Sequence, residues 1–193
     1  MPPTHPHNIH IRPASSALQD GARILAFTDS QLPFLASIGS GGQWGSASNS
    51  AKEAHQTRYR SLIERSENPQ TWGEKDWVKV SILEVDVELE NLSDEVRGLV
   101  TTTHDGRSGR LPVAAMVLEG HSCDYTRPVL AEQDAADPFV YVRYLVGDRR
   151  VGSAYSRGAG RLLLEHADGV ARSLGVGRLA LDGWSGNGGV LVK

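Results

Sequence analysis

The stretch VYVRYLVGDRRVGSAYSRGAGRLLLEHADGVARSLGV, residues 140–176, carries the strongest structural signal in the sequence. An apolar run, residues 139–146, predicts a strand, and a turn rich in Gly and Arg follows it. The turn leads into apolar residues at helical spacing, which predict a helix of about 16 residues. Gly158 and Gly160 remove side chains where this helix begins, so a ligand can approach the backbone N–H groups closely.

Four arginines crowd the same turn: Arg149, Arg150, Arg157 and Arg161. Cations at a helix N-terminus oppose the helix macrodipole, and each costs about 0.3–1 kcal/mol if nothing compensates it. Asp148 is the only acidic residue in the turn that could balance their charge. The exposed N–H groups, the positive end of the dipole and the guanidiniums all favour an anion, so this stretch predicts a site for a phosphate-bearing ligand.

The composition is that of an ordinary globular chain, with 39% hydrophobic and 22% charged residues and a net charge of −3 over 193 residues. We expect one domain, residues 8–193, behind a flexible leader, residues 1–7. So small a net charge gives no signal for nucleic acid or a membrane surface, and no apolar run reaches the ~18–20 residues of a membrane span. A single cysteine, Cys123, excludes an intrachain disulfide and suits a cytoplasmic protein.

Strand and helix signals alternate along the rest of the chain. The expected strands are residues 8–12, 77–89, 99–103, 111–119, 139–146 and 178–184, and the expected helices lie within residues 18–38, 50–66 and 158–174. A slip in the alternation at Leu83 predicts either a bulge or a strand that changes face, and Pro33 predicts an interruption of the first helix. This order predicts an α/β fold with a mixed, mostly antiparallel central sheet flanked by helices.

Three other features have competing interpretations. The acids of residues 84–90 fit a solvated strand face better than the wall of a cation site, because charged side chains are mostly exposed. Gln43 and Trp44 lie in a Gly-rich loop, where Trp44 either plugs a core edge or joins Gln43 in a substrate pocket wall. The histidines of residues 5–10 have no carboxylate or cysteine beside them, so we expect no metal site.

Three kinds of nucleotide loop compete for Gly158-Ala159-Gly160. A Walker loop needs a Gly-Lys-Ser/Thr ending, which is absent. A dinucleotide fingerprint needs a third glycine where Leu163 stands, and its remaining strands have no room after it. A coenzyme A pyrophosphate loop between a strand and a helix fits the strand, the Gly-x-Gly and the arginines.

These residues resemble the GNAT N-acetyltransferase superfamily. Its loop pattern, Arg/Gln-x-x-Gly-x-Gly/Ala, is matched by residues 155–160 (YSRGAG), with Tyr155 in place of the first Arg or Gln and Arg157 offering the missing charge. Residues 179–187 (LALDGWSGN) are similar to the family's next strand and its Asn, and residues 41–44 (GGQW) resemble a substrate-side segment of some members. The resemblance covers roughly residues 9–193, and its last third is the most specific part.

The resemblance implies binding of acetyl-CoA. Residues 144–146 would offer backbone groups to the pantetheine, residues 157–161 would hold the pyrophosphate, and Asn187 would contact the pantetheine arm. The implied cofactor-binding residues are Tyr144, Leu145, Val146, Arg157, Gly158, Ala159, Gly160, Arg161 and Asn187.

The implied reaction is direct attack of a small-molecule primary amine on the acetyl thioester. The N–H of Val146 would polarise the acetyl carbonyl. An alkyl amine has a pKa of about 10.4, so a base must deprotonate it. Glu119, at the end of the neighbouring strand, is the first candidate and Asp124 the second. The other interpretation of Glu119 is a solvated acid at a strand end.

The sequence departs from the family at its end. Family members continue with a helix whose Tyr protonates the departing thiolate and then two more strands, whereas here the Asn is followed by no Tyr. The fold would then be incomplete at the C-terminus, and residues 178–182 would form an exposed edge through which two copies could pair. The departure also keeps a second function open, namely a non-catalytic acyl-CoA sensor or scaffold.

Overall fold

The computed structural model describes residues 8–68, 70–104, 106–126, 128, 130, 133–183 and 185–189. Its strands are β1 (Ile9–Pro13), β2 (Val78–Glu88), β3 (Thr102–His104), β4 (Ser108–Glu119), β5 (Phe139–Gly147) and β6 (Arg178–Leu181). Its helices are α1 (Asp20–Ser37), α2 (Glu53–Glu67), α3 (Asp94–Arg97), α4 (Ser153–Ser156), α5 (Ala159–Ser173) and α6 (Gly186–Gly189), with 3-10 turns η1 (Leu89–Asn91), η2 (Asp124–Thr126) and η3 (Arg149–Val151).

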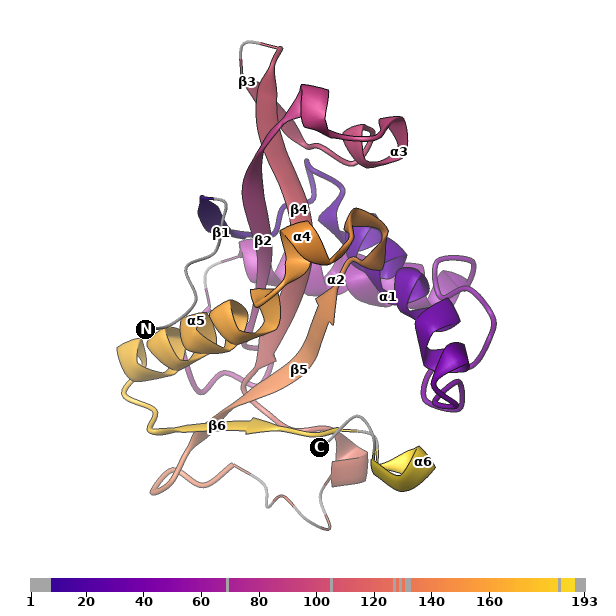
Figure 1. Cartoon of the computed structure of the whole chain (residues 1–193). Coiled ribbons are helices and arrows are strands. Elements are labelled where there is room, and N and C mark those ends of the chain that lie inside the picture. The colour runs from indigo at the N-terminus through magenta and orange to yellow at the C-terminus, as the bar shows by residue number, and fades with distance from the viewer. Residues whose placement is uncertain are drawn as a thin grey trace, which may run out of the picture.

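The strands form one sheet in the order β1-β2-β4-β5-β6, with β3 paired to the far end of β4. Every pair is antiparallel except β5 and β6, which are parallel. The parallel pair is possible because α5 carries the chain from the end of β5 back to the start of β6. The expected α/β class with a mixed, mostly antiparallel sheet is therefore confirmed (Figure 1).

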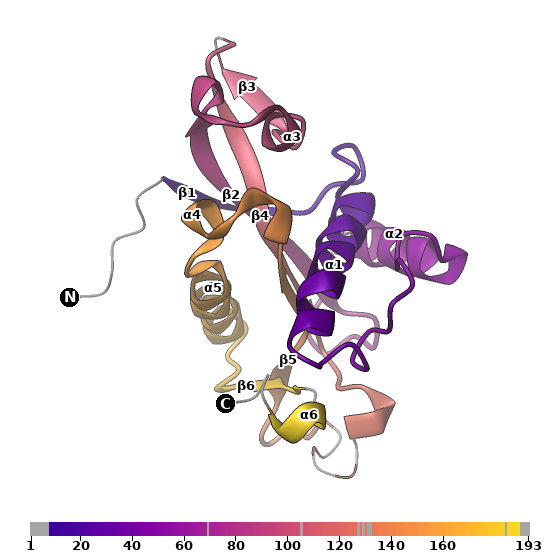
Figure 2. The same ribbon diagram turned by 45° about the vertical axis from the view of Figure 1, so that its right-hand side comes forward.

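Helices cover both faces of the sheet, α5 on one face and α1 with α2 on the other (Figure 2). On the α5 face, Leu163, Ala167 and Ala171 pack against residues of β2, β4 and β5. On the opposite face, residues of α1 and α2 pack against β2, β4 and β5. Among the described residues, no helix has the length and apolar character needed to cross a bilayer.

Two details of the expected elements are settled by the structure. The bulge expected at Leu83 is confirmed, since the register of β2 against β4 shifts between Leu83 and Glu84. The interruption expected at Pro33 is wrong, because α1 continues through this proline to Ser37. A proline removes one backbone donor, and packing of α1 on the sheet outweighs that loss.

The solvated face that the sequence favoured for the acids of residues 84–90 is confirmed at Glu88 and Glu90, which are exposed, but is wrong for Glu84. Glu84 is 1% exposed. It accepts a hydrogen bond from Arg12 Nε (2.8 Å), and Arg12 also contacts the buried Asp20. A buried carboxylate needs such a partner because the loss of hydration is otherwise uncompensated. Asp86 pairs with His10 (2.9 Å), so only the end of the acidic run faces solvent freely.

A second bulge lies in β5, and it changes which side chains face which helix. Val117 pairs with Tyr144 but Leu118 pairs with Val142, so Arg143 is an extra residue in the β5 ladder. Before the bulge, Val142 packs in the α5 cluster; after it, Tyr144 packs against the opposite cluster. The bulge thus places Tyr144 on the face covered by α1 and α2.

Candidate active site

The second half of β5 has one open edge. The parallel ladder with β6 runs only from Phe139 to Val142, while the antiparallel ladder with β4 continues to Gly147. Beyond Val142 the two parallel strands diverge, which Figure 1 shows as the separation of β6 from the end of β5. Among the described residues, residues 143–147 therefore have no strand neighbour on the β6 side.

The register shows which amides of this edge are free. The Asp148 N–H donates to a β4 carbonyl oxygen (2.8 Å), and the Gly147 carbonyl oxygen accepts a hydrogen bond from Gln31 Nε2 of α1. Peptide groups alternate in direction along a strand, so the Val146 N–H faces β4, whereas the amides of Leu145 and Gly147 face away from it. The Val146 N–H therefore does not point to the open edge, as a donor to the acetyl carbonyl would have to. The Leu145 N–H has that orientation.

The N-terminus of α5 lies beside this edge. Leu162 donates the first intrahelical bond, to Gly158 O (3.1 Å), so the amides of residues 159–161 belong to the set that a helix leaves without intrahelical partners. Gly158 has φ +81°, which favours glycine, and a Cβ added there would meet no atom within 4 Å. At Gly160 the nearest atom to an added Cβ belongs to Leu145, at 3.9 Å. Open space therefore adjoins Gly158, and Gly160 lies in van der Waals range of Leu145 on the free edge of β5, so an extended phosphate-bearing ligand could pass from one to the other.

Most arginines of the turn are already engaged. Arg150 pairs with Asp148 (2.7 Å), and Arg161 pairs with a glutamate one turn further along α5. Arg149 Nε donates to a glutamine of α1 (2.7 Å), and its guanidinium stacks on a phenylalanine ring. Arg157 is exposed, and its guanidinium makes no hydrogen bond or ion pair within the described part of the chain. The expected cluster of uncommitted cations is thus reduced to Arg157.

Asn187 and the loop of Gln43 and Trp44 lie on the α1 side of the molecule. Asn187 Nδ2 donates to Ile38 O at the end of α1 (2.7 Å), which ties α6 to that helix. Trp44 packs against the α1–α2 cluster and lines a cavity of about 180 Å³ together with Tyr144. Gln43 is half-buried and does not line that cavity. Trp44 therefore lies near the β5 bulge, whereas Gln43 does not line the cavity there.

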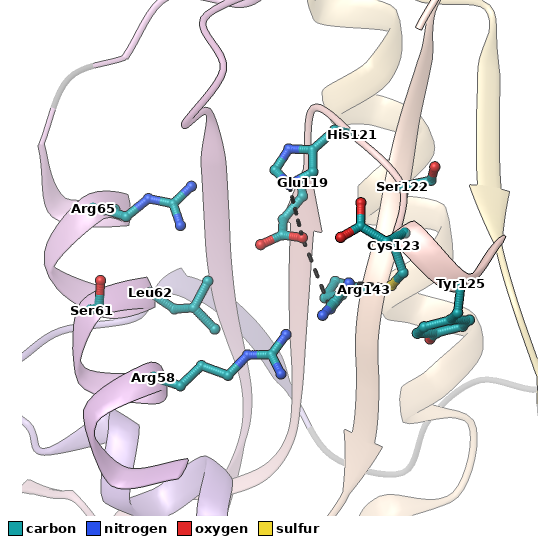
Figure 3. A pocket seen from close by; sticks show the side chains of 11 residues that line it. Arg58, Ser61, Leu62, Arg65, Glu119, His121, Ser122, Cys123, Tyr125 and Arg143 are labelled. Carbon is teal, nitrogen blue, oxygen red and sulfur yellow. Dashed lines mark hydrogen bonds and ion pairs between the residues drawn. The ribbon is translucent and has the colours of Figure 1, made fainter. Parts of the chain in front are cut away.

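The two candidate bases share one cavity. Glu119 ends β4 and Asp124 lies in η2, and both line a space of about 410 Å³ beside the β5 bulge (Figure 3). The Glu119 side chain is only 8% exposed, which excludes the solvated strand-end interpretation. Its Oε2 lies 4.0 Å from His121 Nε2 and 4.0 Å from Arg143 Nε.

Arg143 connects this cavity to the interior of the sheet. Its guanidinium contacts Cys123 Sγ and lies 5.6 Å from the centre of the Tyr144 ring. Burial alone would lower the pKa of Arg143, but its neighbours Tyr144, Cys123 and Glu119 raise the pKa above its usual value. Arg143 therefore stays charged and compensates the enclosed Glu119 carboxylate.

A hydrogen-bonded chain continues from Cys123 to the edge of the sheet. Cys123 Sγ is 3.2 Å from the hydroxyl of Tyr141, which donates to Asp182. Asp182 also accepts from the hydroxyl of Tyr125 (3.0 Å). Burial, Asp182 and Cys123 raise the pKa of Tyr141. This phenol stays protonated and links the end of β6, at Asp182, to Cys123 beside η2.

Sequence reasoning missed two arginines of the same cavity. Arg58 and Arg65 extend from α2 on the side opposite His121 (Figure 3). With Ser61 and Leu62 they form an i, i+3, i+4, i+7 stripe, which the sequence of residues 50–66 contained. The apolar residues of that helix predicted which of its sides is buried. The polar residues beside them do not reveal a shared cavity until the fold is known. No group of three or more potential metal ligands occurs among the described residues.

No family model matches the chain, and no curated protein matches it. Among solved structures the chain is similar to a mutant of the BH1408 protein from Bacillus halodurans (16% identity, 93% of this chain and 85% of that one, TM-score 0.49). It is also similar to AAC(6')-Iy in complex with a bisubstrate analogue, CoA-S-monomethyl-acetylneamine (13% identity, 93% and 82%, TM-score 0.47). A third is a predicted acetyltransferase with acetyl-CoA from Clostridium acetobutylicum (7% identity, 91% and 81%, TM-score 0.48). At these scores, the chemistry must be inferred from the residues of this chain.

Proposed function

We propose that this chain binds acetyl-CoA and transfers the acetyl group to the primary amine of a small molecule. One observation carries the proposal: the open edge of β5, residues 143–147, lies between the glycines at the start of α5 and the cavity of Glu119. A ligand with phosphates at one end and a reactive group at the other would reach from the helix N-terminus to the cavity. The Gly-rich loop alone supports any phosphate ligand, whereas the free strand edge supports an extended amide-bearing arm.

The residues of this chain that would hold the ligand have separate tasks. The amides of residues 159–161 and the Arg157 guanidinium would bind the pyrophosphate. The Leu145 amide, which faces away from β4, would pair with the pantetheine arm or polarise the acetyl carbonyl. Bound acetyl-CoA would supply an acetyl thioester, which an amine attacks directly with release of the free thiol.

Glu119 would act as the base. The carboxylate is enclosed and lies beside the β5 bulge, and a cavity of about 410 Å³ in front of it has room for an amine and a water molecule. Glu119 would take a proton from the ammonium group, directly or through that water, and the neutral amine would then be a nucleophile. Asp124, on the same cavity, remains the second candidate.

Calorimetric titration with acetyl-CoA, followed by an assay of thiol release with a panel of amines, tests the proposal. Binding with a stoichiometry near one and amine-dependent thiol release would support it. Binding without release for any amine would favour the non-catalytic acyl-CoA sensor. Absence of binding would contradict both functions.

We also propose that two copies pair through β6. This strand is the last in the sheet order, and Leu181 on it is 58% exposed. An unpaired edge with an exposed apolar side chain favours pairing with another strand. Sedimentation at increasing concentration should show a dimer that Leu181→Lys weakens, whereas a strictly monomeric profile would contradict the pairing.

A further inference from the structure

We infer that the amine accepted by this site carries an anionic group, a carboxylate or a phosphate ester, which Arg58 and Arg65 bind. This inference rests on the proposed function, because it names the substrate class of the same cavity. It starts from the two sides of that cavity: Glu119, His121 and the η2 residues form one, and the arginine stripe of α2 forms the other (Figure 3).

The sequence of α2 directs both guanidiniums into the cavity. Arg58 and Arg65 are seven residues apart, two turns of helix, so they project from the same side. Tyr59, Leu62 and Ile63 are buried beneath them and fix α2 against the sheet. The arginine pair is therefore held by the core packing of a helix and not by a loop.

Arg58 has no anionic partner among the residues that the structure describes. Its guanidinium lies 5.3 Å from the centre of the Tyr144 ring, and it makes no hydrogen bond or ion pair to the residues that the structure describes. Stacking on an aromatic ring orients a guanidinium while leaving the edge donors available. Arg58 is thus a positioned cation whose guanidinium donors have no partner in the described part of the chain.

Arg65 is partly engaged. Its Nη2 donates to the carbonyl oxygen of Asp76, whose carboxylate is 3.9 Å away and largely exposed. Its Nε is buried and has no hydrogen-bond partner among the described residues. The Arg65 side chain as a whole is 29% exposed and lines the cavity. Its accessible guanidinium donors can therefore bind an anion that lies between Arg58 and Arg65.

The opposite charges on the two sides of the cavity favour one class of amine as the acetyl acceptor. Glu119 and Asp124 attract the ammonium group of an incoming amine, whereas Arg58 and Arg65 attract a carboxylate or phosphate on the same molecule. Arg143, 4.0 Å from Glu119, belongs to the carboxylate side and offsets part of its charge. A molecule with an amine at one end and an anion at the other matches this arrangement, whereas a polyamine would place a cation against the arginines.

The test compares matched pairs of amines in the thiol-release assay after the acetyl-CoA titration. The pairs are amino acids against their carboxamides, which probes a carboxylate, and phosphoethanolamine against ethanolamine, which probes a phosphate. We expect at least one anionic member to have a kcat/KM about ten- to hundredfold above its uncharged partner, since a charge-assisted hydrogen bond contributes that much. The arm with the larger ratio identifies the anion.

Variants of the α2 arginines then test whether these residues cause the preference for anionic amines. Arg58→Gln and Arg65→Gln should bring the ratio close to one, mainly through KM, and Arg58→Lys should retain part of it. Arg60→Gln is the matched control, because Arg60 lies on the same helix and lines a different cavity. Thermal unfolding checks that each variant is folded.

A chain that binds acetyl-CoA and acetylates neutral or cationic amines equally well would overturn the inference and leave the proposed function intact. A preference for anions that survives in both Gln variants, or binding of acetyl-CoA with no turnover of any anionic amine, would also overturn it. Failure to bind acetyl-CoA would instead contradict the proposed function, and the titration detects that outcome first.

Discussion

The two halves of β5 differ although they belong to one continuous apolar run. Residues 139–142 pair with β6, Tyr141 and Val142 among them pair with β4 as well, and all four are at most 5% exposed, so they form the centre of the fold. Residues 144–147 are paired only with β4, and Leu145 is 36% exposed. The bulge at Arg143 separates the halves. Because of this bulge, the first half of one strand belongs to the core, whereas its second half has an edge that is open to a ligand.

The largest loss of stability should follow from truncating a buried side chain in the first half of β5. Phe139→Ala removes a ring that is 1% exposed, and large-to-small changes in a core cost about 3–5 kcal/mol of unfolding free energy. Leu145→Ala, in the second half, should cost less than about 1 kcal/mol, because partly exposed side chains lose little on truncation. Denaturant unfolding of both variants checks the contrast, and equal losses would refute the division of β5.

Activity should depend on the cavity beside the second half. Glu119→Gln should lower kcat about a hundredfold, the typical contribution of a general base, and should leave acetyl-CoA affinity unchanged. Glu95→Gln is the matched control, since Glu95 is exposed on α3. Steady-state kinetics beside a titration separates the two effects. Full activity in Glu119→Gln would transfer the role to Asp124, which Asp124→Asn would then test.

Cofactor affinity should depend on the single unengaged arginine of the turn. Arg157→Gln should weaken acetyl-CoA binding about tenfold through the loss of a charge-assisted hydrogen bond. Arg172→Gln, at the far end of α5 and already paired with Asp168, should have no such effect. Calorimetry at low and high salt measures both variants. An unchanged affinity in Arg157→Gln would remove this arginine from the site.

The smallest expected effect concerns Asp29, which anchors the segment after Trp44 to α1. Burial by itself would raise the pKa of Asp29, but hydrogen bonds from Ser48, Asn49 and Ser50 lower it below the usual value. The depressed pKa means that this stabilisation is present above pH 4 and is lost as the pH falls through the folded-state pKa.

Asp29→Asn should therefore lower stability at pH 7 by about 1 kcal/mol, a modest amount because solvent screens a half-exposed carboxylate. The variant should also lose less stability than the parent chain as the pH is lowered from 5 to 3. Thermal unfolding across that range measures both effects. Parallel pH profiles for the two proteins would contradict the role of Asp29.

Local sequence patterns predicted the parts of the fold that depend on neighbouring residues. The β5–turn–α5 unit and the bulge at Leu83 each follow from periodicity within one segment. The bulge at Arg143 was not predicted, because the residues around Arg143 in 139–146 are apolar on both strand faces and have no alternation whose phase could slip. Its position depends on the register of β5 against β4, which forms between distant segments.

Long-range pairs account for the other differences. Glu84 was expected in solvent because its partner, Arg12, is 72 residues away in the chain. Arg58 and Arg65 gave no signal, since their shared cavity exists only after α2 packs beside β4 and η2. The pairing of Arg161 with Glu165 was accessible from i, i+4 spacing and would have reduced the expected cationic cluster.

The most direct test of the central claim is the response of β5 amides to acetyl-CoA, followed residue by residue by NMR and hydrogen exchange. Saturating acetyl-CoA should shift and protect the Leu145 amide, which faces the open edge. The amides of Tyr141 and Val142, which belong to residues paired with both β4 and β6, should change little. A Leu145 amide that is unaffected while acetyl-CoA is bound would contradict the assignment of the second half of β5 as the binding edge.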